Sequence, residues 1–152
     1  MTRIKTPVGW REWVALPELG IRGIVAKIDT GARSSALHVD EQWEFTQDGE
    51  PWIGFVIHNM HEGSAGIQGL ARILDRRPVT DSGGHRALRP FIATTLVLAG
   101  QHRTVEVNLC SRRTMTYPML LGRTAIRTRY LVDANRSFMH GGNLRTRPTE
   151  LS

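Results

Sequence analysis

The stretch KIDTGARSSALH, residues 27–38, places a carboxylate and a tight turn directly after an apolar strand. The β-branched run before it predicts a strand over residues 23–28, and residues 33–39 predict the strand that leaves the turn. Gly31 lets the chain reverse sharply between the two strands. Asp29 is therefore expected where a rigid scaffold presents catalytic side chains, although Asp, Thr and Gly also make ordinary structural turns.

Three further side chains of this stretch have open roles. Ser34 and Ser35 either hold the turn by hydrogen bonds or lie as hydroxyls on the strand surface, and the second role is favoured. Arg33 puts a cation near Asp29, where it either holds an acidic side chain of a substrate or makes a surface ion pair.

Length and composition indicate an ordinary globular domain. The chain has 152 residues, of which 40% are hydrophobic and 22% charged, enough for one domain with a substantial core. It contains no apolar run of membrane-spanning length, and residues 1–7 have no apolar signal region. A single cysteine, Cys110, excludes an internal disulfide and is expected to be a small core residue. These features predict a cytoplasmic protein with no membrane partner.

The positive charge of the chain comes almost entirely from arginine. The formal net charge is +6, and Lys5 and Lys27 are the only lysines. Arginine favours bidentate contacts with carboxylate and phosphate, so an acidic partner is expected, either a glutamate-rich peptide or RNA. A solvated basic surface without a partner is the alternative.

The rest of the chain predicts short strands joined by tight turns, which indicates an all-β fold. The strands are expected over residues 8–15, 42–47, 51–58, 70–77, 88–99, 102–109, 119–121 and 130–133. Asp48-Gly49 is a strong signal for a tight hairpin turn, and residues 59–69 are expected to be a loop. Residues 123–129 predict one or two helical turns. The tryptophans are expected to be buried anchors.

Two glycine-containing segments follow the Asp29 turn. DSGGH, residues 81–85, is typical of a flexible hairpin tip that closes over a substrate, and equally of an ordinary hairpin turn. MLLGR, residues 119–123, predicts a short buried strand, in which Gly122 lets the chain pass close to another backbone.

Taken in this order, DTGA (29–32), DSGGH (81–85) and LLGR (120–123) resemble the retropepsin-like aspartic peptidases over roughly residues 22–133. The amino-acid sequence around these segments is similar to that of a bacterial group often labelled ATP-dependent zinc proteases. Some members of that group are found beside the ATP-grasp ligase that adds glutamates to a ribosomal protein. The resemblance implies a retropepsin-like closed barrel with a flap hairpin and one short C-terminal helix.

The resemblance also implies the extent of the domain. Residues 1–133 are expected to form one domain, and residues 134–152 a tail that is partly ordered at most. Phe138 and Met139 are the tail residues expected to dock on the domain.

The resemblance further implies the residues of the site. The catalytic residues would be Asp29, Thr30 and Gly31. The substrate-binding residues would be Ala32, Arg33, Ser82, Gly83, Gly84 and His85. Aspartic peptidase chemistry needs two carboxylates that share a proton, and the chain has one Asp-Thr-Gly, so the hypothesis requires a homodimer. Arg123 matches an arginine of the family that is structural.

No metal and no cofactor is expected. The chain has no His-Glu-x-x-His, no paired cysteines and no phosphate-binding Gly-x-x-x-x-Gly-Lys-Ser/Thr loop. The histidines of segment 58–61 with Glu62, or His38 and His85 near Asp29, leave a metal-dependent hydrolase as one alternative. A non-catalytic, arginine-rich β module that binds RNA or a ribosomal partner is the other.

Overall fold

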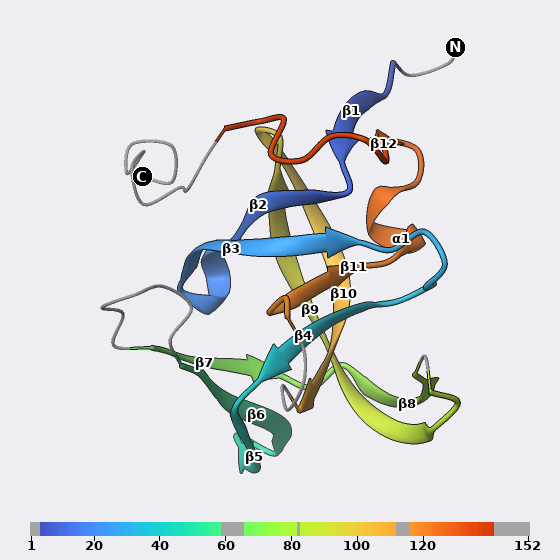
Figure 1. The fold of residues 1–152 in the computed structure, drawn as a ribbon. Helices are drawn as coiled ribbons and strands as arrows, with labels where there is room; N and C mark the ends of the chain where they lie inside the picture. The colour runs from blue at the N-terminus through green and yellow to red at the C-terminus, as the bar shows by residue number, and fades with distance from the viewer. Residues whose placement is uncertain (1–3, 59–65, 82, 112–115, 142–152) are drawn as a thin grey trace.

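A closed ring of strands forms the body of the protein (Figure 1). The computed structural model describes residues 4–58, 66–81, 83–111 and 116–141. The main sheet has the order β10 (Gln101–Ser111), β4 (Ser35–Val39), β11 (Met119–Leu121), β3 (Ile21–Ile28), β2 (Arg11–Leu16), β9 (Arg86–Leu98) and β8 (Asp75–Thr80). Because β10 also pairs with β9, the sheet closes on itself, and β8 remains outside the ring as the partner of β9. The expected all-β fold is confirmed, and the ring of strands is consistent with the expected closed barrel.

Inward-facing side chains of the ring, together with those of β6 (Glu50–Ile57) in a second sheet, form one apolar core. The largest fully buried members are Leu16, Ile21, Ile24, Leu37, Ile53, Phe55, Ile57, Ile92, Leu96, Leu98 and Leu109. Each contributes about 1.5–3 kcal/mol when it leaves water, so the core gives the site a rigid support. Among the residues that the structure describes, no helix reaches the length and hydrophobicity needed to cross a membrane.

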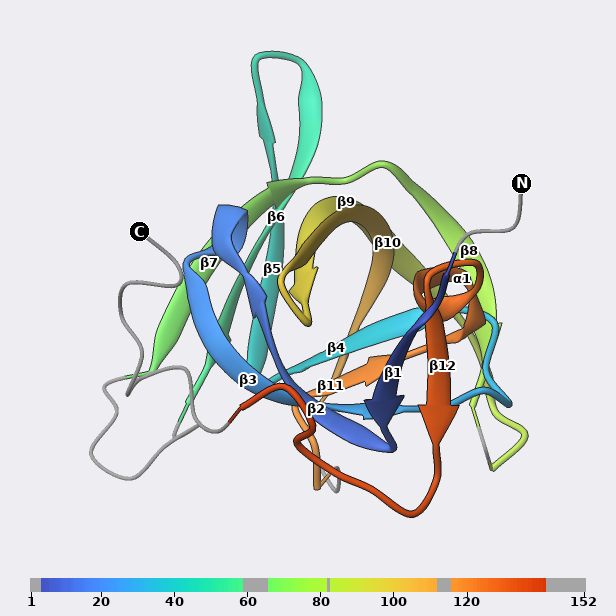
Figure 2. The ribbon, with the colours of Figure 1, turned by 90° about the horizontal axis from the view of Figure 1, so that it is seen from above.

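A second sheet of three strands closes one side of the core. It consists of β5 (Glu41–Gln47), β6 (Glu50–Ile57) and β7 (Ile67–Arg72), all antiparallel. The expected turn joins β5 to β6, with positive φ at both Asp48 and Gly49 as a two-residue hairpin requires. Figure 2 shows this hairpin projecting from the ring.

The predicted boundaries of two elements are wrong in this region. The expected loop over residues 59–69 ends earlier, because β7 already begins at Ile67, while residues 59–65 lie outside the described part. The expected strand 70–77 is divided between β7 and β8. The Ile73 N–H bonds the Pro51 carbonyl in the second sheet and the Leu74 N–H bonds the Phe91 carbonyl in the main sheet, so the chain changes sheets between these residues.

The expected burial of the tryptophans is also wrong. Trp10, Trp13 and Trp52 are half-buried, and Trp43 is 40% exposed on the outer face of the second sheet. In β2 the reason is Glu12, which takes the inward position next to Val14. Its carboxylate accepts the N–H groups of Gly9 and Met139 at 2.7 and 3.0 Å, so a buried charge is satisfied and Trp13 is turned outward.

The two ends of the described chain meet beside β2. β1 (Thr6–Gly9) pairs in parallel with β12 (Tyr130–Asp133), and the predicted strand 8–15 is therefore interrupted at Trp10. Beyond β12, Phe138 packs against Trp13, with ring centroids 6.2 Å apart. Phe138 and Met139 thus make the contacts with the domain that the sequence predicts.

Candidate active site

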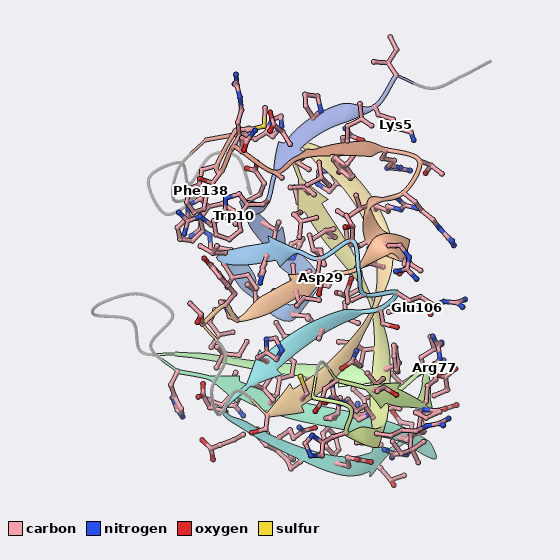
Figure 3. All side chains as sticks on the ribbon, turned by 45° about the vertical axis from the view of Figure 1, so that its right-hand side comes forward. Lys5, Trp10, Asp29, Arg77, Glu106 and Phe138 are labelled. Atoms are coloured by element: carbon pink, nitrogen blue, oxygen red, sulfur yellow. The ribbon has the colours of Figure 1, made fainter. Side chains whose placement is uncertain are left out.

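The Asp29 turn, residues 29–34, joins two strands that are not neighbours. β11 lies between β3 and β4, parallel to the first and antiparallel to the second. The turn therefore has to cross the end of β11, and Figure 3 shows Asp29 at this place, beyond the end of β3. β11 continues directly into α1 (Arg123–Ile126), which places the start of that helix beside the turn.

Backbone hydrogen bonds fix the turn on β11 and α1. The Asp29 N–H donates to the Leu121 carbonyl at 2.8 Å, and the Arg123 N–H donates to the Ala32 carbonyl at 2.8 Å. The Arg33 carbonyl accepts the hydroxyl of Thr124 at 3.0 Å. These bonds join both ends of the turn to a single rigid element.

The Asp29 side chain is half-buried and has a defined orientation. Its Oδ1 accepts the Gly31 N–H at 2.9 Å. Among the described residues, Oδ2 has no hydrogen-bond partner, so it is available to a water, a substrate or a second carboxylate. Asp29 thus has the geometry of a general base: one oxygen is held and the other is open.

Space requires glycine at Gly122 and favours it at Gly31. A Cβ on Gly122 would lie 2.5 Å from the Ser34 carbonyl oxygen, which no real side chain tolerates. A Cβ on Gly31 would lie 3.1 Å from Oδ1 of Asp29 and would press on the carboxylate. The expected close approach of Gly122 to another backbone is confirmed, and the partner is the end of the Asp29 turn.

The favoured role of Ser35 as a surface hydroxyl is wrong. Ser35 is fully buried, and its Oγ accepts the N–H of Gly122 at 3.1 Å. Because β11 lies against β4, this N–H faces Ser35 in the interior, where it would otherwise be unsatisfied. The open alternative, a hydroxyl that holds the turn region, is the correct one for Ser35.

Arg123 has the structural position that the resemblance implies. Its Nη1 donates to the Thr30 carbonyl at 3.1 Å, so it ties the exposed middle of the turn to the start of α1. Arg33, in contrast, is exposed on the turn, and the described residues include no ion pair with it. The ion-pair alternative for Arg33 therefore finds no partner in this part of the chain.

The expected flap is the β8–β9 hairpin, and Asp81 organises its tip, residues 81–85. The Asp81 carboxylate accepts the N–H groups of Gly83 and His85, each at 2.9 Å. The hydrogen bond from the His85 N–H is the largest of the influences that hold the pKa of Asp81 below its usual range. Sequence reasoning missed this role, although an Asp two residues before glycine is a signal for such a turn.

The hairpin tip and the Asp29 turn lie on the same side of the molecule in both Figure 1 and Figure 2. The structure thus gathers the proposed site residues into two groups. The turn holds Asp29, Thr30, Gly31, Ala32 and Arg33, and the tip holds Gly83, Gly84 and His85. Ser82 lies outside the described residues.

The histidines that were considered as metal ligands lie apart. His38 is buried, with Nδ1 at 3.0 Å from the Tyr117 carbonyl oxygen, and its N–H bonds Pro118. Asp29 bonds the other end of β11, so the strand separates the two. Nδ1 of His85 faces the Asp81 carboxylate at 3.6 Å. The described residues contain no group of three or more potential ligands, and residues 59–62 of the other candidate cluster are not among them.

Cys110 is a half-buried residue of β10, and its Sγ lies 3.9 Å from the Leu37 carbonyl oxygen. Burial raises the pKa of its thiol, which disfavours the thiolate that nucleophilic catalysis needs.

Comparison with known proteins agrees with this geometry. A family model described as "Retropepsin-like aspartic endopeptidase RimB" matches residues 7–142. A solved structure of a Legionella pneumophila protein of unknown function superposes with a TM-score of 0.73 and 26% identity, covering 90% of this chain and 99% of that one.

Curated relatives carry a different name. Proteins called "Probable alpha-L-glutamate ligase" from Shewanella pealeana and Parasynechococcus marenigrum are 37% and 38% identical over 142 residues, which is 93% of this chain. The match spans only 31% and 30% of those relatives' own lengths.

Proposed function

Because the chain belongs to the RimB-like family of retropepsin-like aspartic endopeptidases, we propose that it hydrolyses peptide bonds with Asp29 as the catalytic carboxylate. One observation carries the proposal. Oδ1 of Asp29 is held by the Gly31 N–H while Oδ2 is open, on a turn whose backbone is bonded to β11 and α1. This is the orientation that activation of a water requires.

The chemistry needs a second carboxylate, and the chain has one Asp-Thr-Gly. We therefore propose a symmetric homodimer in which two Asp29 side chains meet on the twofold axis. Two carboxylates at contact distance do not both ionise, so the pair holds one proton.

The ionised carboxylate then removes a proton from water, whose oxygen attacks the scissile carbonyl carbon. The protonated carboxylate donates a hydrogen bond to the carbonyl oxygen. The tetrahedral intermediate collapses as the C–N bond breaks, and the amine nitrogen takes the proton that the first carboxylate removed from water, so the pair again holds one proton.

An acidic, glutamate-rich peptide is the proposed substrate. Arg33 is an exposed cation on the same turn as Asp29, and the chain has a net charge of +6, which attracts a polyanionic peptide. The ligase name of the relatives supports the same class, because an α-glutamate ligase and a peptidase for glutamate-rich chains would act on the same kind of peptide.

Replacement of Asp29 by Asn is the decisive experiment. It removes the base and keeps the shape, so cleavage of a glutamate-rich peptide should fall on the order of 10²- to 10⁴-fold. Asp48→Asn is the matched control, because Asp48 lies in the projecting β5–β6 turn and Asn tolerates its positive φ. Circular dichroism should show both variants folded.

Three results would overturn parts of the proposal. Full activity of Asp29→Asn excludes Asp29 as the base. Loss of wild-type activity with a chelator, restored by zinc, supports the metal-dependent alternative instead. A strict monomer at every concentration in sedimentation equilibrium contradicts a dyad shared by two chains.

The RNA-binding alternative is disfavoured on the face where aromatic side chains gather. Phe45 stacks on Trp52 with ring centroids 6.4 Å apart, and Trp43 is exposed beside them. However, Arg72 of β7, in register with Trp52, is the only Lys or Arg of the three strands. Glu41 and Glu50 lie two positions from Trp43 and Trp52 on the same strands, so their carboxylates share this face. A single arginine beside two carboxylates does not make the positively charged groove that binds a phosphate backbone.

A further inference from the structure

Two arginines lie opposite each other in the β8–β9 hairpin. Arg77 of β8 is in register with Arg89 of β9, so both side chains are on the same face of the hairpin. Like charges directly opposite one another are unfavourable unless something compensates each of them. How each guanidinium is compensated therefore indicates what it is for.

Arg77 is fully compensated within the protein. Its Nε and Nη2 donate to the Asp75 carboxylate at 2.8 and 3.1 Å, and its Nη1 donates to Glu106 at 2.7 Å. Its guanidinium also lies 4.4 Å from the centroid of the Phe91 ring. Arg77 thus has a structural role in joining β8 to β9 and β10.

Arg89 has no carboxylate partner among the described residues. Its Nη1 donates to a neutral acceptor, Oδ1 of Asn108, at 3.2 Å, and its other N–H groups have no partner in this part of the chain. The nearby Asp81 carboxylate is already occupied by the N–H groups of Gly83 and His85. Arg89 is nevertheless half-buried, so its charge is partly removed from water while its hydrogen bond within the described residues goes to a neutral group.

Asn108 connects Arg89 to the structure that supports Asp29. Asn108 is buried, and its Nδ2 donates to the Ser35 carbonyl at 2.8 Å. The Oγ of Ser35 in turn accepts the N–H of Gly122, which follows β11 and lies against the end of the Asp29 turn. The guanidinium of Arg89 is therefore linked through Asn108 to β4, the strand that leaves the turn.

The electrostatic influence of Arg89 agrees with this position. The hydrogen bond from the His85 N–H is the main cause of the lowered pKa of Asp81, and the charge of Arg89 acts in the same direction. The same charge opposes the burial that raises the pKa of Cys110 on β10. The charge of Arg89 thus influences both a carboxyl group at the hairpin tip and a thiol on β10 of the ring.

We propose that Arg89 is a specificity-determining residue that binds an acidic side chain of the peptide substrate as it passes between the hairpin and the Asp29 turn. Asn108 holds one guanidinium nitrogen, and the remaining N–H groups are presented to a carboxylate, the acceptor whose planar geometry they match. This inference rests on the proposed peptidase function and adds the residue that selects glutamate over its neutral isostere. Arg33 is exposed on the turn, and among the described residues no hydrogen bond orients its side chain.

The test compares two peptides of equal length and sequence that differ only in glutamate against glutamine. Arg89→Gln should raise KM for the glutamate peptide by about tenfold or more, leave kcat nearly unchanged, and abolish the preference for glutamate. Arg89→Lys keeps the positive charge but loses the planar guanidinium that donates two parallel hydrogen bonds, so it should retain part of the preference for glutamate. Arg86→Gln on the same strand is the matched control, because Arg86 is exposed and should change neither constant.

A merely structural role of Arg89 would lower thermal stability and kcat for both peptides alike, and an unchanged glutamate preference in Arg89→Gln overturns the inference. A binding measurement with catalytically inactive protein distinguishes a wrong role for Arg89 from a wrong peptidase assignment. The Asp29→Asn protein, with and without Arg89→Gln, is titrated with the fluorescent glutamate peptide. If the wild type cleaves neither peptide but Arg89→Gln weakens binding tenfold, the proposed function fails and acid recognition stands. If Asp29→Asn binds the glutamate peptide with the same affinity with and without Arg89→Gln, the proposed role of Arg89 is overturned.

Discussion

The Asp29 turn and the β8–β9 hairpin tip are both tight glycine turns on the same side of the molecule, yet they are held in different ways. The Asp29 turn has internal bonds from the Gly31 and Ala32 N–H groups to Asp29, and it is also bonded to other elements, with Leu121 and Arg123 as backbone partners. At the tip, the bonds are internal: the Asp81 N–H and carboxylate bond His85, and the Gly84 N–H bonds the Asp81 carbonyl. The Asp29 turn is therefore bonded to the core strands, whereas the hairpin tip is held by hydrogen bonds within itself.

This difference matches two requirements of the proposed chemistry. A catalytic carboxylate has to keep its orientation while bonds are made and broken, which a turn bonded to β11 and α1 provides. A segment that covers a substrate has to move without unfolding the protein, which a self-contained tip on the outermost strand pair provides. Substitutions in the first turn should therefore affect global stability, and those in the second only local order.

The largest expected effect is that of Gly122→Ala. The new Cβ would lie 2.5 Å from the Ser34 carbonyl oxygen, so β11 or the Asp29 turn must shift. The free energy of unfolding should fall by about 2–3 kcal/mol in urea titration, and activity should fall with it. Gly84→Ala at the tip is the matched control. Gly84 has φ of +84° with open space around it, so the cost is about 1 kcal/mol of local strain.

A similar loss for the two glycine variants would contradict the comparison. It would mean that the tip is as tightly coupled to the core as the Asp29 turn is.

Ser35→Ala should have the next largest effect. It leaves the Gly122 N–H without its acceptor at a fully buried position, which costs about 1–3 kcal/mol of unfolding free energy. Ser34→Ala at the neighbouring, half-buried position should change stability by less than about 0.5 kcal/mol. Chemical denaturation of both variants decides between the roles of the two hydroxyls, and equal stabilities would remove the role assigned to Ser35.

The smallest expected effect is local and depends on pH. The pKa of Asp81 is lowered in the folded protein, so its contribution to tip order is complete above the ordinary aspartate pKa, near 4, and is lost as the pH falls through the folded value. In NMR spectra the amide protons of Gly83 and His85 should move upfield together over that range. The global fold should be unaffected.

Asp81→Asn tests the same point without acid. The neutral side chain accepts a weaker hydrogen bond, and the pH-dependent shift of the two amides should disappear. A titration that persists in the variant would assign it to another group, and His85 and Arg89 are the charged neighbours to replace next.

Local sequence patterns predicted much of this architecture. Asp48-Gly49 predicted the β5–β6 turn, and MLLGR predicted both β11 and the start of α1. The second long hairpin was also expected, although its turn lies at Ala99-Gly100, one residue before the predicted Gly100-Gln101. These signals come from backbone conformations that particular residues favour, so they can be read from a few neighbouring residues.

Roles that depend on distant partners were missed or wrong. Glu12 was unremarkable in the sequence, but in the fold it binds the N–H groups of residues 127 and 128 positions away. Trp43 looked like a core residue, but it lies on Gly54 at the outer face of a projecting sheet. Neither position can be inferred from composition or alternation, because register decides which face of a strand is inward.

The sequence alone therefore determined the all-β class, the turn at Asp29 and the glycines that such a turn needs, because these follow from local conformational preference. Only the tertiary structure decided which side chains support that turn and that the hydrogen-bond partner of Arg89 among the described residues is the neutral Asn108. Ser35, Asn108 and Arg89 come from three strands, and their contacts exist only because the ring of strands closes and brings β4, β10 and β9 together.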